Sequence, residues 1–273
     1  MTTGTKPLLT LGFSPCPNDT FIFNGLVNGP VQIPGYTVEA RLHDVESLNR
    51  MAFEGHLDVT KLSFFAWLKV KAHYRLLSSG GALGFGCGPV VIADRELTRN
   101  DMAHARIALP GEWTTAHLLF RLWAPRANRR TFLPYDRIFN ALRSGEADCG
   151  VIIHESRFTF EKEGFRPVVD LGAWWESRTG LPIPLGCIAV HKRHPEHLDR
   201  MLDEAIRASI DLAKRNPALA LSYIQAHAQE MTSDVLDAHI RTFVNEFSLD
   251  LGAAGREAVA ALEKEAIRIG VIP

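Results

Sequence analysis

The side chain with the clearest chemical capacity in this sequence is His154, which directly follows the apolar run from Cys149 to Ile153. Such a run is typical of a buried strand, and a strand delivers the residue after it to the edge of its sheet. Because the pKa of imidazole lies close to neutral pH, a histidine placed there can accept a proton from a substrate. The alternative is a histidine that only stabilises the strand end.

Two adjacent threonines, Thr114 and Thr115, stand at the predicted start of a helix that continues to Trp123. The first backbone N–H groups of a helix have no intrahelical partner and attract anions. Threonine hydroxyls at this position can also donate to a carboxylate. The pair therefore indicates an anion site, with an ordinary helix cap as the alternative.

Two further polar segments are candidates for ligand binding. Lys61, Leu62 and Ser63 follow a predicted strand, where Lys61 can supply positive charge and Ser63 can donate to a ligand or cap the next helix. In the Pro-rich loop 14–19, Asn18 or Asp19 is the expected N-cap of a helix from Thr20 to Val27. Asn18 and Thr20 can hydrogen-bond a polar ligand, and a merely rigid loop is the alternative.

The elements that must position these residues contain a phrase that occurs twice. The sequence GHLDV at 55–59 leads into Lys61, and GEADC at 145–149 leads into His154. In each phrase the glycine can end a helix and the aspartate can fix the turn into a strand. Unless the match is a coincidence, the doubled phrase indicates two similar lobes whose polar clusters face one cleft.

Strands alternate with helices through the first two thirds of the chain, which predicts an α/β fold. The order resembles the two-lobed periplasmic-binding-protein type II fold, which has a ligand cleft between its lobes. That resemblance implies chain crossings near 94–100 and 184–190. The first lobe is then expected to comprise residues 1–95 and 188–273, and the second lobe residues 96–187.

Composition narrows the class of protein. The chain has 273 residues, and its 30 Lys and Arg balance its 31 Asp and Glu, so no net field favours nucleic acid or an anionic membrane. No run of about 18 apolar residues is present, and Met1 to Lys6 is polar, which predicts a cytoplasmic protein without a signal peptide. A small-molecule substrate is the expected partner, and the oligomeric state is left open.

Other apparent motifs indicate no additional site. The four scattered cysteines contain no CxxC pair, which favours free thiols over a metal site or disulfides. The histidines at 191, 194 and 197 lack a common helical face because Pro195 interrupts them, so no metal is expected. Glycines 84, 86 and 88 lead into a strand rather than a phosphate-binding helix. Trp174 and Trp175 are expected to belong to the core, with a stacking platform for a flat aromatic substrate as the alternative.

Six segments together resemble the 1,4-dihydroxy-6-naphthoate synthases, and they extend over nearly the whole chain. They are FSPCPNDTF at 13–21, TKLS at 60–63, SSGGALG at 78–84, VIIHESRF at 151–158, DLGAWW at 170–175 and FVNEFSLD at 243–250. The first and fourth segments are long enough to be specific. Trp113, before the threonine pair, differs from the family pattern.

This resemblance implies a binding-protein fold used for catalysis in the futalosine route to menaquinone. The expected lyase reaction cleaves cyclic dehypoxanthinyl futalosine to 1,4-dihydroxy-6-naphthoate and a three-carbon fragment, without a metal or organic cofactor. The resemblance gives His154 the role of proton acceptor, and it assigns Lys61 to Ser63 and Thr114 to Thr115 to ligand binding. A solute-binding or sensor domain for an organic acid, and the related chorismate dehydratase, are the alternatives.

Overall fold

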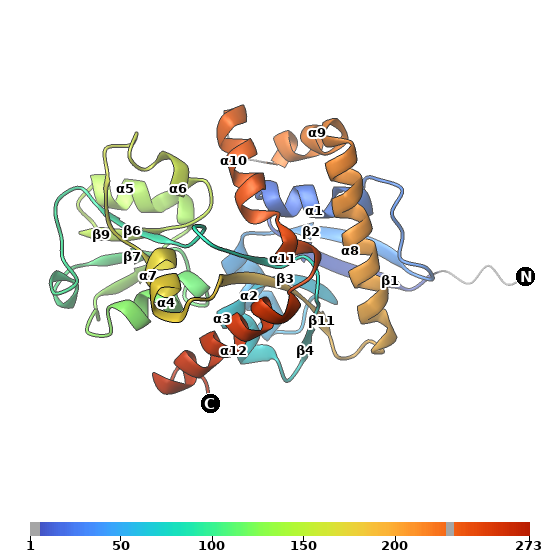
Figure 1. The fold of residues 1–273 in the computed structure, drawn as a ribbon, viewed down its shortest axis with the longest axis horizontal. Coiled ribbons are helices and arrows are strands. Elements are labelled where there is room, and N and C mark those ends of the chain that lie inside the picture. The colour runs from blue at the N-terminus through green and yellow to red at the C-terminus, as the bar shows by residue number, and fades with distance from the viewer. Residues whose placement is uncertain (1–5, 228–231) are drawn as a thin grey trace, which may run out of the picture.

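The computed structural model describes residues 6–227 and 232–273 and arranges their strands in two sheets (Figure 1). The first sheet has the order β2-β1-β3-β11-β4, with β5 also paired to β11, and the second has the order β10-β6-β9-β7-β8. The first sheet consists of β1 (Leu8–Phe13), β2 (Thr37–Leu42), β3 (Val59–Ser63), β4 (Tyr74–Leu76), β5 (Ala82–Gly84) and β11 (Ile183–His191). The second consists of β6 (Val90–Ala93), β7 (Ile107–Leu109), β8 (Arg130–Phe132), β9 (Cys149–Ile152) and β10 (Arg166–Asp170).

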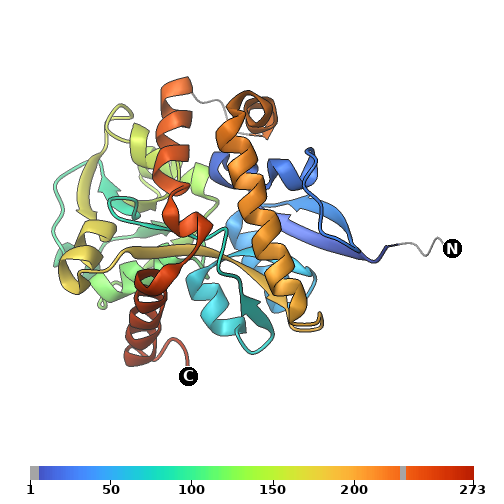
Figure 2. The ribbon, with the colours of Figure 1, turned by 45° about the vertical axis from the view of Figure 1, so that its right-hand side comes forward.

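Each sheet carries its own helices, and we call each sheet with its helices a lobe. The first lobe has α1 (Pro17–Val27), α2 (Val45–Phe53), α3 (Phe64–Val70), α8 (His197–Arg215), α9 (Pro217–His227), α10 (Ser233–Phe243), α11 (Glu246–Leu249) and α12 (Gly252–Arg268). The second has α4 (Thr115–Trp123), α5 (Ile138–Arg143), α6 (Ser156–Thr159) and α7 (Leu171–Thr179). The long α8 packs on α1, and α10 to α12 run down the middle of the molecule (Figure 2).

The predicted α/β organisation with two separate sheets is confirmed, and the two GxxD phrases fall in different sheets. The predicted crossing points are wrong. Strand β6 pairs with β9 and β10 in the second sheet, so the chain crosses at 85–89, before this strand. The return falls at 180–182, because β11 pairs with β3 in the first sheet along 186–190. Sheet membership depends on these long-range pairings, which local sequence does not encode.

Several element boundaries follow from local chemistry. Asp44 caps α2, because its side chain accepts from the backbone N–H groups of Glu46 and Ser47. The start of α1 was predicted too late. Cys16 is its N-cap and Pro17 stands at N1, where the missing N–H costs nothing and the fixed φ suits a helix. Thr232 is the N-cap of α10.

The apolar faces of both lobes are buried in packed clusters of side chains. The largest cluster joins residues of β3, β7 and β9 with α3, α4 and α7, so it continues from one lobe into the other. A second cluster lies between the first sheet and α1 and α8. Among the described residues, no helix combines the length and apolar character that crossing a membrane requires.

Candidate functional site

A cavity of about 690 Å³, counting the space open to solvent, lies between the two lobes. Six of the eight residues predicted for the site line it: Asn18, Lys61, Ser63, Thr114, Thr115 and His154. Sequence reasoning did not assign several other lining residues to the site, among them Ser14, Asp19, Arg157, Gly186 and Phe243. The predicted convergence of the polar segments from both lobes on one cleft is therefore present in the structure.

Two predicted residues, Leu62 and Thr20, lie outside this lining. Leu62 is fully buried in the core, because side chains alternate along β3 and Leu62 faces away from its neighbours Lys61 and Ser63. The Thr20 hydroxyl donates to the carbonyls of Cys16 and Pro17 at 3.1 and 3.3 Å, within the first turn of α1. Both side chains stabilise the fold around the cavity.

His154 lies at the end of β9 with φ at 55°, and it is the one non-glycine residue with positive φ in the described chain. Such backbone strain is concentrated at functional sites. Its ring lies 5.3 Å from the Tyr135 ring and makes no hydrogen bond to any other described residue. Burial holds the pKa of His154 below its usual value near 6.5, so the imidazole is neutral at pH 7 and can accept a proton.

The hydroxyl of Ser63 is oriented by the fully buried Asn49. The Asn49 amide donates to Ser63 Oγ at 3.2 Å and its Oδ1 accepts from the Ser63 backbone N–H at 2.9 Å. Ser63 is the N-cap of α3, yet its side chain makes no capping hydrogen bond. The hydroxyl hydrogen of Ser63 can therefore be donated into the cavity.

The start of α4 forms the opposite wall, but its two threonine hydroxyls already donate to backbone carbonyls. Thr114 Oγ donates to Gly111 O at 3.0 Å and caps the helix by accepting from the His117 N–H. Thr115 Oγ donates to Leu185 O at 2.8 Å and accepts from the Phe65 N–H at 3.3 Å. The first N–H groups of α4, at positions 115 and 116, remain for an anion.

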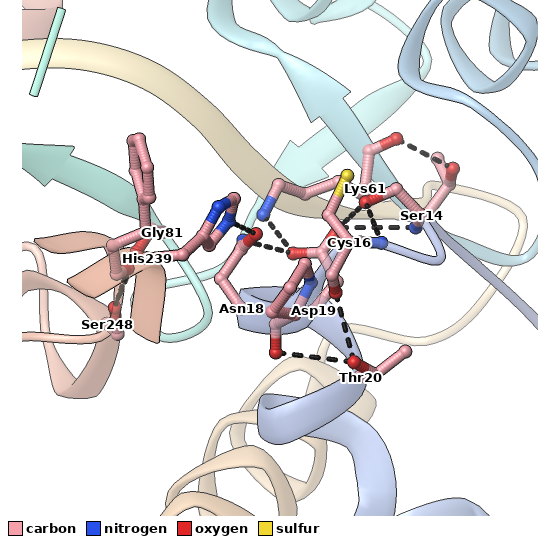
Figure 3. Close-up of polar contacts among 12 residues, drawn as sticks. Ser14, Cys16, Asn18, Asp19, Thr20, Lys61, Gly81, His239 and Ser248 are labelled. Carbon is pink, nitrogen blue, oxygen red and sulfur yellow. Dashed lines mark hydrogen bonds and ion pairs between the residues drawn. The ribbon is translucent and has the colours of Figure 1, made fainter. Parts of the chain in front are cut away.

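Lys61 is part of a buried polar network with residues of α1 (Figure 3). Its ammonium lies 2.5 Å from Asp19 Oδ1, which also accepts from the Asn18 amide at 2.9 Å. The second carboxylate oxygen of Asp19 accepts from the Ser14 hydroxyl at 2.7 Å. Gly186 faces Lys61 from β11, where a Cβ would meet Lys61 Cε at 3.0 Å, so glycine leaves room for the lysine stem.

A second cation, Arg157 on α6, reaches the cavity from the second lobe. It donates to Asp170 Oδ2 and to the carbonyl of Gly88, each at 2.6 Å. Both cations of the cavity are thus paired with carboxylates. The site contains little uncompensated positive charge, and an acidic ligand depends on hydroxyl and backbone N–H donors.

The tryptophans noted in the sequence lie outside the cavity lining. Trp175 is fully buried and donates to Pro182 O, which agrees with the predicted core role. Trp174 is only half-buried: it packs against the core, with Arg178 over its ring. Trp113 lies at the junction of the lobes, where its ring meets the Phe53 ring edge-on at 5.0 Å and its backbone N–H donates to Glu46 Oε2 at 3.0 Å. Trp113 therefore contributes to the contact between the lobes rather than to the cavity wall.

The four cysteines are buried free thiols, as the sequence predicts. Burial raises the pKa of each of them, to about 12 at Cys87 and Cys149, so the thiols are protonated and unreactive at neutral pH. Within residues 6–227 and 232–273, no three His, Cys, Asp or Glu side chains gather as ligands of one metal ion.

Comparison with known proteins identifies the family. A family model described as menaquinone biosynthesis matches residues 9–267. The chain belongs to the menaquinone biosynthesis family. A member from Thermus thermophilus, named "1,4-dihydroxy-6-naphtoate synthase", is 51% identical over 94% of this chain and 93% of its own length. A protein of the same name from Streptomyces coelicolor is 40% identical over 97% and 95% of the two chains.

Solved structures show the same architecture in this family and beyond it. A protein from Archaeoglobus fulgidus, 30% identical, matches 98% of this chain and 100% of its own with a TM-score of 0.92. The alkanesulfonate-binding protein SsuA from Xanthomonas axonopodis matches 99% and 96% of the two chains, with a TM-score of 0.72 at 15% identity. This family member thus has the predicted periplasmic-binding-protein-like fold.

Proposed function

We propose that this chain is a lyase that converts cyclic dehypoxanthinyl futalosine to 1,4-dihydroxy-6-naphthoate in menaquinone biosynthesis, with His154 as the proton acceptor. The observation that carries the proposal is the state of His154. It is a neutral imidazole in a strained backbone position at the interlobe cavity, and its ring nitrogens form no hydrogen bond within the described chain. The names of the two curated relatives support the reaction.

The substrate carboxylate is held by neutral donors in this proposal. The Ser63 hydroxyl approaches it from the first lobe, and the backbone N–H groups of Thr115 and Ala116 approach it from the second. The positive end of the α4 dipole favours the anion at the same place. Lys61 and Arg157 shape the site as paired charges rather than as free cations.

His154 then removes a proton from the bound substrate. The electron pair released by that deprotonation drives carbon–carbon cleavage, and aromatisation of the ring yields the naphthoate. The low pKa of His154 keeps the base unprotonated at pH 7, and a closed cavity keeps water from the reacting bond.

The two lobes are proposed to close on the substrate about the connections at 85–89 and 180–182. Contacts across the junction support this motion. Thr115 of the second lobe donates to Leu185 of the first, and Glu46 of the first accepts from Trp113 of the second. The cytoplasmic location and the lack of a cofactor remain predictions.

Product analysis tests the proposal. Purified protein is incubated with cyclic dehypoxanthinyl futalosine and, separately, with chorismate, and products are separated by mass. Formation of 1,4-dihydroxy-6-naphthoate by the wild-type protein, and its loss in a folded His154→Asn variant, is the expected result. Conversion of chorismate alone would instead make the chain a chorismate dehydratase, and binding without turnover would make it a solute-binding protein.

A further inference from the structure

A second histidine, His239 on α10, is fully buried beside the site, and its two ring nitrogens have different surroundings. Nε2 lies 2.9 Å from Asn18 Oδ1, as Figure 3 shows. Nδ1 has no hydrogen-bond partner within the described residues, although it is shielded from solvent. A buried polar atom without a partner costs free energy, so its persistence calls for an explanation.

The polar network fixes which nitrogen of His239 carries the hydrogen. Asp19 Oδ1 accepts from the Lys61 ammonium and from the Asn18 amide group. The Asn18 carbonyl oxygen must then face His239, and a carbonyl oxygen only accepts. Nε2 of His239 is therefore the protonated nitrogen, and Nδ1 is left as a bare acceptor.

The nearest ring on the second lobe is that of His154. The two imidazoles are almost parallel, with an interplanar angle of 6° and centroids 6.2 Å apart. Phe243 and Phe158 pack around His239, with centroids at 4.7 and 6.4 Å. Burial, together with the charges of His154 and Lys61, lowers the pKa of His239 well below its usual value, so this ring stays neutral.

We propose that His239 is a positioning residue for His154: its Nε2–H fixes the Asn18 amide, and its bare Nδ1 accepts a hydrogen bond from His154 once His154 is protonated and its ring turns toward His239, since the parallel rings form no hydrogen bond with each other in this structure. The role rests on the proposed function, in which His154 takes one proton from the substrate. That proton stays on His154, and His239 neither gains nor loses one. The hydrogen bond stabilises the imidazolium and satisfies the buried acceptor in the same step.

The effect on titration has a definite sign. A hydrogen bond accepted from the imidazolium favours the charged form, so it raises the pKa of His154 against the lowering caused by burial. Loss of the acceptor should move the midpoint of His154 titration to lower pH. The other ionisable groups that face His154 are unchanged in such a variant, namely Glu155, Asp19, Lys61, Asp44 and Tyr135.

Two variants separate the hydrogen bond from packing. His239→Phe keeps an aromatic ring against Phe243 but removes both nitrogens, and His239→Gln keeps a donor for Asn18 and an acceptor for His154. We expect kcat to fall roughly 10- to 100-fold in His239→Phe, the factor that one hydrogen bond to a charged group represents, with a smaller change in KM. The Gln variant should recover most of this loss.

Nitrogen NMR of histidine-labelled full-length protein tests the same idea without substrate. The wild-type spectrum should show His239 neutral with the hydrogen on Nε2, and His154 should titrate at lower pH in His239→Phe than in wild type or His239→Gln. A hydrogen on Nδ1 of His239, or equal His154 midpoints in all three proteins, would overturn the proposal. Absence of turnover in wild type would contradict the proposed function alone, since the NMR measurements do not depend on it.

Discussion

The Lys61 ammonium lies 2.5 Å from Asp19 Oδ1, and the two side chains are among the most deeply buried charged groups of the protein. The sequence indicated Lys61 as a free positive charge for an acidic ligand. Its charge is instead balanced by a residue 42 positions earlier in the chain. The pair holds the loop before α1 against β3 and so determines the shape of the cavity floor.

Replacing Asp19 by Asn tests this pairing. Asn has almost the same shape, but it leaves the Lys61 cation buried without a counter-charge. We expect Asp19→Asn to lower the free energy of unfolding by about 3–5 kcal/mol, measured by urea denaturation. Adding Lys61→Met should restore most of that stability, because an apolar residue needs no partner. A loss in the single variant of less than about 1 kcal/mol, the size typical of exposed pairs, would contradict the buried ion pair.

The variant His154→Asn tests the proposed base. Asn tolerates positive φ better than most residues, so the backbone at 55° should be kept and the melting temperature should change little. It cannot accept the proton, and general-base catalysis typically contributes about 10²–10⁴-fold, so kcat should fall by that factor while KM changes much less. Near-normal turnover in the folded variant would leave His154 with a structural role only.

The pH dependence of turnover follows from the lowered pKa of His154. The base is active when neutral, so activity should be retained above this pKa and lost as the pH falls through it. Because burial lowers the pKa, the acid limb of kcat/KM should lie below pH 6.5. A stopped assay across a pH series gives the limb directly. If activity is instead lost at or above pH 6.5, the profile reports the titration of another group or of a more exposed histidine, and not that of the buried His154.

The variant Thr115→Val separates two roles of this residue. The sequence indicated this hydroxyl as a donor to a ligand carboxylate, and loss of such a hydrogen bond would weaken binding by roughly 1.5–3 kcal/mol. In the structure the hydroxyl joins Leu185 and Phe65 of the first lobe, so its loss leaves two backbone groups without a partner. We now expect the free energy of unfolding to fall by about 1–3 kcal/mol with a small change in KM, and Thr115→Ser to behave like wild type. A tenfold rise in KM at unchanged stability would restore the original interpretation.

The stability of the fold at acidic pH should depend on His117, which is buried in the first turn of α4. Its Nδ1 lies 2.7 Å from Glu112 O and its Nε2 lies 3.2 Å from Arg130, so the neutral ring donates to the first and accepts from the second. Burial lowers the pKa of His117 from 6.5 to about 4. The unfolded chain therefore binds a proton that the folded chain does not, and stability is lost as the pH falls from about 6.5 to about 4.

The shift of His117 corresponds to about 3 kcal/mol. The variant His117→Gln cannot titrate, so its stability should fall less than that of wild type across this pH range by about that amount. Chemical denaturation at pH 7 and pH 4 measures the difference. Equal losses in the two proteins would mean that His117 is not the group responsible, and that other buried histidines account for the acid sensitivity.

Local sequence predicted the elements with long apolar runs or clear caps. Strand β1 coincides with a largely apolar run in the sequence, and helix α2 begins directly after Asp44, a residue type that favours the N-cap position. Strands β4, β5 and β8 were missed, because three residues are too few for a periodic pattern. The helix α7 was missed as well, although Asp170 caps it in the same manner as Asp44 caps α2.

In the site as well, features set by neighbouring residues could be predicted from the sequence, and contacts between distant residues could not. Placement of His154 and Ser63 at strand ends was predictable, because strand ends in an α/β sheet face the ligand. The residues that hold these side chains in place could not be predicted from the sequence. Asn49 holds Ser63 from another helix, and His239 reaches Asn18 from 221 positions away. Nothing in the sequence around His239 distinguishes it from an ordinary buried residue of an amphipathic helix.

The pairing of β5 with β11 shows how the second lobe is connected within the chain of the first. Gly84, the last residue before the second lobe, is the register partner of Ile183, the first strand residue after it. Partners in an antiparallel ladder are only about 4.5–5.5 Å apart, the separation that a two-residue turn closes. The second lobe is thus an insertion into a single hairpin of the first. Because the largest apolar cluster continues from one lobe into the other, removing residues 85–182 would expose the part of that cluster that the first lobe contributes.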